Sequence, residues 1–124
     1  MEERRIRVTA GDVTMTAMLN RSSTADLVWD ALPIQAPAQT WSDEIYFSTS
    51  IDAQEEDSKD VVDMGDVAYW PPGQALCLFF GPTPMSRGDE IRPASAVNVV
   101  GRLEGDATAL KQVRSGSPVV IEKA

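Results

Sequence analysis

The sequence of 124 residues contains no histidine and a single cysteine. Without histidine the chain cannot build a Ser-His triad, a histidine-ligated zinc site or an imidazole proton shuttle. With one cysteine it cannot form an intramolecular disulfide, so no disulfide framework points to secretion. Cys77 lies in the apolar run 75–80 without a cationic neighbour in sequence, so we expect a small buried thiol rather than a nucleophile.

Basic residues and long apolar runs are also scarce. Eleven Lys and Arg stand against nineteen Asp and Glu, which gives a net charge of −8. Binding to nucleic acid or to an anionic membrane needs a basic face, so neither partner is expected. The run 75–80 is far shorter than the roughly 20 residues that span a bilayer, and no apolar segment follows the charged residues 1–5 as in a signal peptide. We therefore expect one cytoplasmic domain over residues 1–124, with no cofactor and no metal site.

Short strand patterns separated by turn signals run along most of the chain. Alternating, β-branched and aromatic residues predict strands from Ile34 onward and at 4–8, 13–19, 44–48, 66–70, 75–80, 96–103 and 118–122. Two short helices are predicted, at 25–32 and at 106–113. The first has the apolar spacing i, i+3, i+4, i+7 and ends before Pro33, and the second begins at the N-cap Asp106. Seven or eight strands with two short helices predict a mainly β, closed or nearly closed barrel.

Two connecting segments are unusual in composition. Residues 52–60 are the most acidic part of the chain, and we expect a solvated loop there. Calcium binding is the alternative for this run, although it lacks the Asp-x-Asp-x-Asp-Gly spacing of a calcium loop. Residues 81–90 form a long connection rich in Pro and Gly, and such loops in small domains are usually packed or functional.

Four motifs in a fixed order resemble a known family. They are WSDEIYF at 41–47, GDVAYWPPG at 65–73, FFGPTPMS at 79–86 and IRPASAVNVVG at 91–101. Together they resemble a prokaryotic family of small uncharacterised proteins with a cyclophilin-like fold, over nearly the whole chain. The resemblance implies a closed, eight-stranded cyclophilin-like β-barrel with one or two short helices near its ends. It implies no established activity.

True cyclophilins are prolyl isomerases, and their cleft differs from what this sequence offers. It combines a catalytic Arg, flanking Phe and Gln, and ligand-contacting Trp and His. The strings that carry these residues in cyclophilins are absent here, and no His exists to fill one position. The fold therefore transfers by resemblance, and the chemistry does not follow from it.

The candidate ligand-binding residues are aromatic side chains, one carboxylate and one arginine. In each adjacent aromatic pair along a strand, alternation sends one side chain inward and the other outward, where a loop, helix or ligand must cover it. The carboxylate is a general base if burial beside aromatics raises its pKa, or else a strand-edge hydrogen-bond acceptor. The arginine either clamps a ligand carboxylate or braces Asp89 and Glu90. The candidates are Trp41, Glu44, Tyr46, Tyr69, Trp70, Phe79, Phe80 and Arg92.

Three functions remain open at this point. The favoured one is a binding module that holds a small molecule or an extended peptide in a surface groove. The alternative is a weak or divergent peptidyl-prolyl isomerase, which needs an apolar pocket for the proline ring and a donor such as Arg92 or Arg102. The third is an oligomer-forming protein whose aromatics meet a second subunit, since the oligomeric state is unknown. The acidic balance steers positively charged ligands in more readily than anions.

Overall fold

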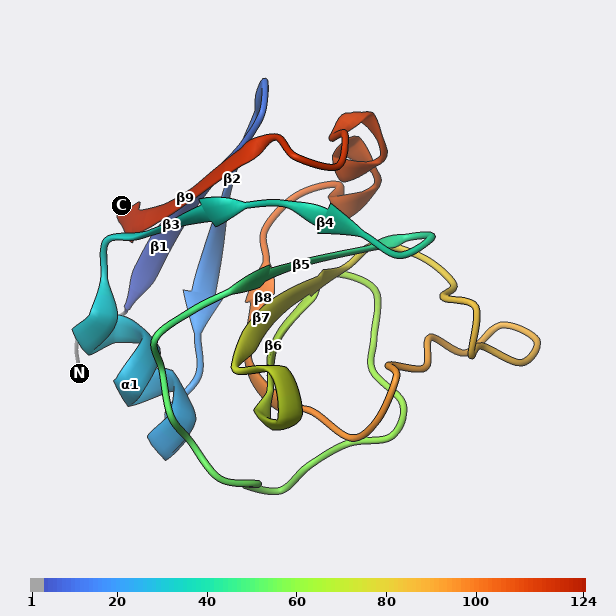
Figure 1. Cartoon of the computed structure of the whole chain (residues 1–124), viewed down its shortest axis with the longest axis horizontal. Coiled ribbons are helices and arrows are strands. Elements are labelled where there is room, and N and C mark those ends of the chain that lie inside the picture. The colour runs from blue at the N-terminus through green and yellow to red at the C-terminus, as the bar shows by residue number, and fades with distance from the viewer. Residues whose placement is uncertain (1–3) are drawn as a thin grey trace.

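Within the described residues, 4–124, nine strands form one antiparallel sheet (Figure 1). Residues 1–3, part of the charged N-terminal stretch considered above, lie outside the described residues. The strands are β1 (Arg5–Ala10), β2 (Val13–Leu19), β3 (Ile34–Pro37), β4 (Gln39–Thr40), β5 (Glu44–Ser48), β6 (Asp66–Trp70), β7 (Ala75–Phe79), β8 (Asn98–Leu103) and β9 (Pro118–Lys123). The helices of this computed structural model are α1 (Ser23–Ala31) and the 3₁₀ turns η1 (Pro71–Gly73) and η2 (Ala107–Gln112).

The two edges of the sheet are consecutive in sequence, and this closes the barrel. The strand order is β3-β9-β1-β2-β8-β6-β7-β5-β4, so β3 and β4 stand at opposite ends of it. Only Ala38 separates them in the chain, and its N–H and carbonyl bond to the segment before β9. One bent segment thus pairs with β9 and then with β5. The predicted mainly β, nearly closed barrel is confirmed, with nine strands rather than eight because this segment bends after Pro37.

Both predicted helices begin at side-chain N-caps, and Asp106 is the cap predicted for the second one. The Ser22 hydroxyl accepts a hydrogen bond from Ala25 N (3.1 Å), and α1 ends before Pro33. Asp106 accepts from Thr108 N (3.0 Å) at the start of η2, which is a 3₁₀ helix. Among residues 4–124, no helix is both long enough and apolar enough to cross a membrane.

Period-two alternation divides the buried side chains into two clusters. The first fills the barrel interior, where Phe47, Tyr69 and Leu78 pack together with the apolar face of α1. The second lies on the outward face of β6 and β7, where we find Ala68, Cys77 and Phe79. Apolar side chains on an outward face need a cover, and two loops supply it.

The cover consists of the acidic segment and the long loop that follows β7. Lys59 N donates to Val97 O (2.8 Å) and Val62 N to Ile91 O (2.9 Å), so the two loops are joined by backbone bridges. The acidic run 52–60 forms no helix. One of its side chains, Glu56, stabilises the start of α1 by accepting hydrogen bonds from the backbone N–H groups of Ser23 and Thr24. Most of the Pro/Gly-rich segment 81–90 is exposed, and the residues of this connection that pack on the sheet are Ile91, Pro93 and Val97 at its end.

Candidate functional site

A pocket opens on the outward face of β5, β6 and β7, beneath the long loop. The register pairs Tyr46 with Cys77 and Glu44 with Phe79, so Glu44, Tyr46 and Cys77 project from the same face of the sheet. On β6, Ala68 is paired with Cys77, and Trp70 projects from that face two residues later. The strand register alone therefore brings four side chains of different chemistry to one place.

A tight turn between β4 and β5 places a further aromatic ring at this site. Trp41 and Glu44 exchange backbone hydrogen bonds (2.9 and 3.2 Å) across a two-residue turn. Ser42 in the turn adopts the left-handed region, with φ of 56°. Side chains of directly opposed residues lie on the same face, so Trp41 stands beside the Glu44 carboxyl.

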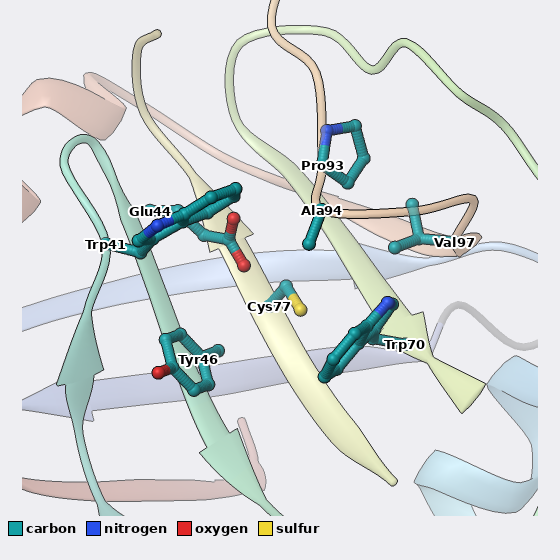
Figure 2. A pocket seen from close by; sticks show the side chains of 8 residues that line it. All are labelled: Trp41, Glu44, Tyr46, Trp70, Cys77, Pro93, Ala94 and Val97. Atoms are coloured by element: carbon teal, nitrogen blue, oxygen red, sulfur yellow. The ribbon is translucent and has the colours of Figure 1, made fainter. Parts of the chain in front are cut away.

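The pocket has a volume of about 150 Å³. Figure 2 shows Trp41 and Trp70 on opposite sides of it, with Tyr46 below Trp41 and the Glu44 carboxyl and Cys77 thiol between the two indole rings. The long loop closes the remaining side. The lining residues are Trp41, Glu44, Tyr46, Trp70, Cys77, Pro93, Ala94 and Val97.

The rim of the pocket is fixed by hydrogen bonds and by close packing. Trp70 Nε1 donates to Ser95 Oγ (2.7 Å), which ties the indole to the loop. A Cβ on Gly73 would lie 2.5 Å from the Trp70 ring, so only glycine fits beneath it. Within the loop, Ser86 Oγ accepts from Thr83 N (2.9 Å) and from Arg92 N (3.1 Å). The hydroxyls of Thr83 and Ser86 thus shape the loop, since the Thr83 hydroxyl also accepts from Met85 N (3.2 Å).

Glu44 carries the unusual electrostatics of the site. The residue is only 5% exposed, and its Oε1 atom is buried without a hydrogen-bond partner. Burial raises the pKa of Glu44 to about 7, while a hydrogen bond from the Cys77 thiol opposes part of the rise. Burial and the neighbouring Glu44 raise the pKa of Cys77, so the thiol stays protonated at neutral pH. An unpaired buried acceptor in a pocket is a position where a ligand donor gains a hydrogen bond.

Four of the eight candidate residues meet at this pocket and four do not. Trp41, Glu44, Tyr46 and Trp70 line it. The others are placed elsewhere by packing or pairing: Tyr69 and Phe80 in the barrel cluster, Phe79 under the loops in the outer cluster, and Arg92 in an ion pair.

The tyrosine and the arginine outside the pocket have their polar groups occupied. The Tyr69 hydroxyl donates to Ile51 O (2.6 Å) inside the barrel. Arg92 Nε donates to Glu90 Oε1 (2.9 Å), which is the bracing alternative considered from the sequence. The second candidate cation, Arg102, pairs with Asp63 (3.1 Å) and Asp66 (3.4 Å).

Four lining residues were missed by sequence reasoning. Cys77 was expected to be a buried thiol, and it is buried, but the alternation from Leu76 and Leu78 could have assigned it to the outward face. Pro93, Ala94 and Val97 belong to the loop, and no periodic pattern marks which loop side chains turn toward the sheet. In the part of the chain that the structure describes, no three His, Cys, Asp or Glu side chains converge on a metal-sized site.

Comparisons with known proteins agree with this architecture. No curated protein matches the chain. The solution structure of a hypothetical protein from Archaeoglobus fulgidus is similar to it, with a TM-score of 0.83 and 47% sequence identity over 98% of this chain and 95% of that one. The model of the Cyclophilin-like family matches residues 4–122. The chain therefore belongs to the Cyclophilin-like family.

Proposed function

We propose that this protein is a binding protein that holds a small molecule, or one side chain of a peptide, in the pocket between Trp41 and Trp70. The observation that carries the proposal is the buried Glu44 carboxyl, which lines an aromatic-walled pocket and whose Oε1 atom has no hydrogen-bond partner. Leaving such an acceptor unpaired costs roughly 1–3 kcal/mol, and a ligand donor placed there recovers that cost.

The size of the pocket limits the occupant. A cavity of roughly 150 Å³ is known to admit one benzene molecule, so the buried part of the ligand is about one ring or a short branched chain. The exposed Ala94 lies at the margin of the pocket, so the rest of a larger ligand can remain in solvent. This size supports a metabolite fragment or a single side chain better than several consecutive residues of an extended peptide.

The composition of the walls supports the same function. Trp41, Tyr46 and Trp70 offer large rigid surfaces for an apolar body. Glu44 supplies one polar group at the base, and ligand pockets commonly combine an apolar lining with a few such groups. Because the Trp70 indole already donates to Ser95, Glu44 is the group we assign to orientation of the ligand.

Prolyl isomerase activity has less support from this geometry. The pocket has the apolar walls that a proline ring needs, but no arginine is among the residues that line it in the described chain. Arg92 and Arg102, the candidate donors, are both held in ion pairs with carboxylates. A direct check is exchange NMR on an Ala-Pro peptide with substoichiometric protein, for which we expect no acceleration of the slow uncatalysed exchange.

The proposal is tested by ligand-detected NMR with a panel of water-soluble fragments of one-ring size. We expect saturable binders to the wild type and at least a tenfold loss of their affinity in Ala94→Phe, which fills the margin of the pocket. Met85→Phe is the matched control, because Met85 is exposed on the same loop and does not line the pocket. The proposal would be contradicted if no fragment bound, or if the fragments bound Ala94→Phe as tightly as the wild type.

A further inference from the structure

The charge of the pocket is of one sign. Glu44 is the carboxyl among the eight lining residues, and no Lys or Arg lines the pocket in the described part of the chain. The whole chain carries a net charge of −8, which adds a field that attracts cations. A ligand that brings a positive charge therefore meets no repulsion at the site.

The walls also favour a cation. Aromatic rings attract a positive charge through the negative potential of their faces, and Trp is the strongest of the three aromatic residues in this respect. Trp41 and Trp70 stand on opposite sides of the pocket, and Tyr46 lies on a third side (Figure 2). Three rings around one carboxyl form a site that can hold both the charge and the carbon atoms of an organic cation.

The unpaired atom selects the kind of cation. Glu44 Oε1 accepts hydrogen bonds but has no donor. An ammonium with an N–H group supplies both a donor and a charge, whereas a quaternary ammonium supplies only the charge. We infer that the pocket takes a protonated amine on a small apolar body, with the amine N–H donated to the Glu44 carboxyl and the carbon atoms against Trp41 and Trp70. This inference rests on the proposed function, whose ligand class it names.

Binding of an amine depends on pH, because an ammonium stabilises the ionised form of Glu44. Its pKa is about 7 in the free protein, so below pH 7 the amine must displace a proton from the carboxyl. Three other titratable groups lie near Glu44: the Cys77 thiol on β7, the Tyr46 hydroxyl on β5, and Asp43 in the turn, which is 4.0 Å from Lys111. Burial raises the pKa of the thiol, so it adds no charge in this range.

Amine binding weakens toward acid pH. The affinity for the amine falls about tenfold for each pH unit below pH 7, because the fraction of ionised Glu44 falls by that factor. It is level from above pH 7 up to about pH 10, where an alkylamine itself loses its proton. A neutral ligand of the same shape shows no such fall toward acid pH.

The experiment is isothermal titration calorimetry with cyclohexylamine and cyclohexanol, which share a ring but differ in charge. At pH 8 we expect cyclohexylamine to bind at least tenfold more tightly than cyclohexanol. Near pH 5.5 the two affinities should be similar. Glu44→Gln should remove the preference for cyclohexylamine over cyclohexanol at pH 8 and the dependence of the amine affinity on pH. Glu104→Gln is the control for net charge, because it removes a surface carboxylate that pairs with Arg5 outside the pocket. This variant should keep the preference for cyclohexylamine over cyclohexanol.

The outcomes separate the two proposals. If cyclohexanol binds as tightly as cyclohexylamine, the amine inference falls and the pocket remains a small-molecule site. If other fragments bind but cyclohexylamine does not, the same conclusion holds. If no fragment binds at all, the proposed function falls together with the inference.

A second pair of probes identifies the source of the amine. n-Butylamine is a free amine, and a blocked Gly-Lys-Gly tripeptide presents the same ammonium on a peptide. Tighter binding of the tripeptide assigns a peptide side chain as the ligand, and binding of n-butylamine alone assigns a free amine. Failure of both, like failure of cyclohexylamine, counts against the inference.

Discussion

Replacing Glu44 by Gln tests whether the pocket holds this carboxyl away from water. The two side chains have nearly the same shape, but only Glu can ionise. Burial raises the pKa of Glu44 from its ordinary value of 4.5 to about 7, so the folded protein binds the proton more tightly than the unfolded chain. The stabilisation that comes from protonation is fully present below pH 4.5, is lost as the pH rises to about 7, and changes no further above it.

The size of this effect follows from the two pKa values. At about 1.4 kcal/mol per pH unit, Glu44 lowers the free energy of unfolding of the wild type by about 3 kcal/mol between pH 4.5 and pH 8. The Glu44→Gln variant does not undergo this loss of stability, because Gln does not ionise. The stability of the variant relative to the wild type is therefore expected to rise by about 3 kcal/mol across the same range, whatever the offset between them at acid pH.

Urea denaturation followed by circular dichroism at pH 4.5, 5.5, 6.5 and 8 measures this difference. Glu104→Gln is an informative control, because hydrogen bonds from Arg5 and Thr16 lower the pKa of Glu104. Its contribution to stability is present above its ordinary pKa of 4.5 and is lost only at more acid pH, so the free energy of unfolding of Glu104→Gln relative to the wild type should stay nearly constant from pH 5.5 to 8. If the difference in free energy of unfolding between Glu44→Gln and the wild type does not change with pH, the conclusion that burial raises the pKa of Glu44 is refuted.

Three further substitutions test the assignment of side chains to barrel, loop and pocket. Tyr69→Phe removes the hydroxyl bonded to Ile51 O, so urea denaturation should show a loss of about 1–2 kcal/mol while calorimetry shows unchanged ligand affinity; lost binding would contradict the inward placement. Trp70→Phe removes the indole bond to Ser95 Oγ, so amide hydrogen exchange should accelerate in residues 91–97 and not in the barrel strands. Asn98→Ala breaks three hydrogen bonds of a buried amide and should cost about 2–4 kcal/mol in thermal unfolding; a cost under 1 kcal/mol would contradict this network.

The barrel could be predicted because its signals are local. Tyr46 and Phe47 alternate between the two faces of β5, and turn residues mark most strand ends. The ninth strand was missed because the bend after Pro37 divides one segment between two partners, and pairing partners are not written in a local pattern. The alternation pattern predicted a closed or nearly closed barrel, and the resemblance to the family implied a closed one.

The site was predictable only in part, for a related reason. Glu44 and Trp41 were identifiable as a carboxylate and an aromatic ring near a strand start, and the strand register brings Trp70 beside them. Phe79 and Phe80 were both candidates because one of the pair must point outward; Phe79 is the outward one, yet Val62 and Ile91 from two distant loops bury it. Which outward side chains a loop covers depends on tertiary packing, and sequence spacing does not encode it.

Arg92 takes the bracing alternative of the two that the sequence left open. Arg92 stands next to Pro93, which does line the pocket, but its guanidinium turns to Glu90 two residues away. The Glu90 carboxylate is only two residues from Arg92, so the ion pair forms at little entropic cost. Glu44 is then the charged group that lines the pocket.

The most direct test of the binding pocket uses the three indole N–H signals of the ¹⁵N-labelled protein. Trp41 and Trp70 line the pocket, whereas Trp29 lies on α1 with its ring 4.7 Å from Lys123 Nζ, and so serves as an internal control. Titration with the tightest fragment should shift the Trp41 and Trp70 signals saturably, with one dissociation constant, and leave Trp29 in place. Saturable binding that moves Trp29, or that moves neither Trp41 nor Trp70, would contradict the account.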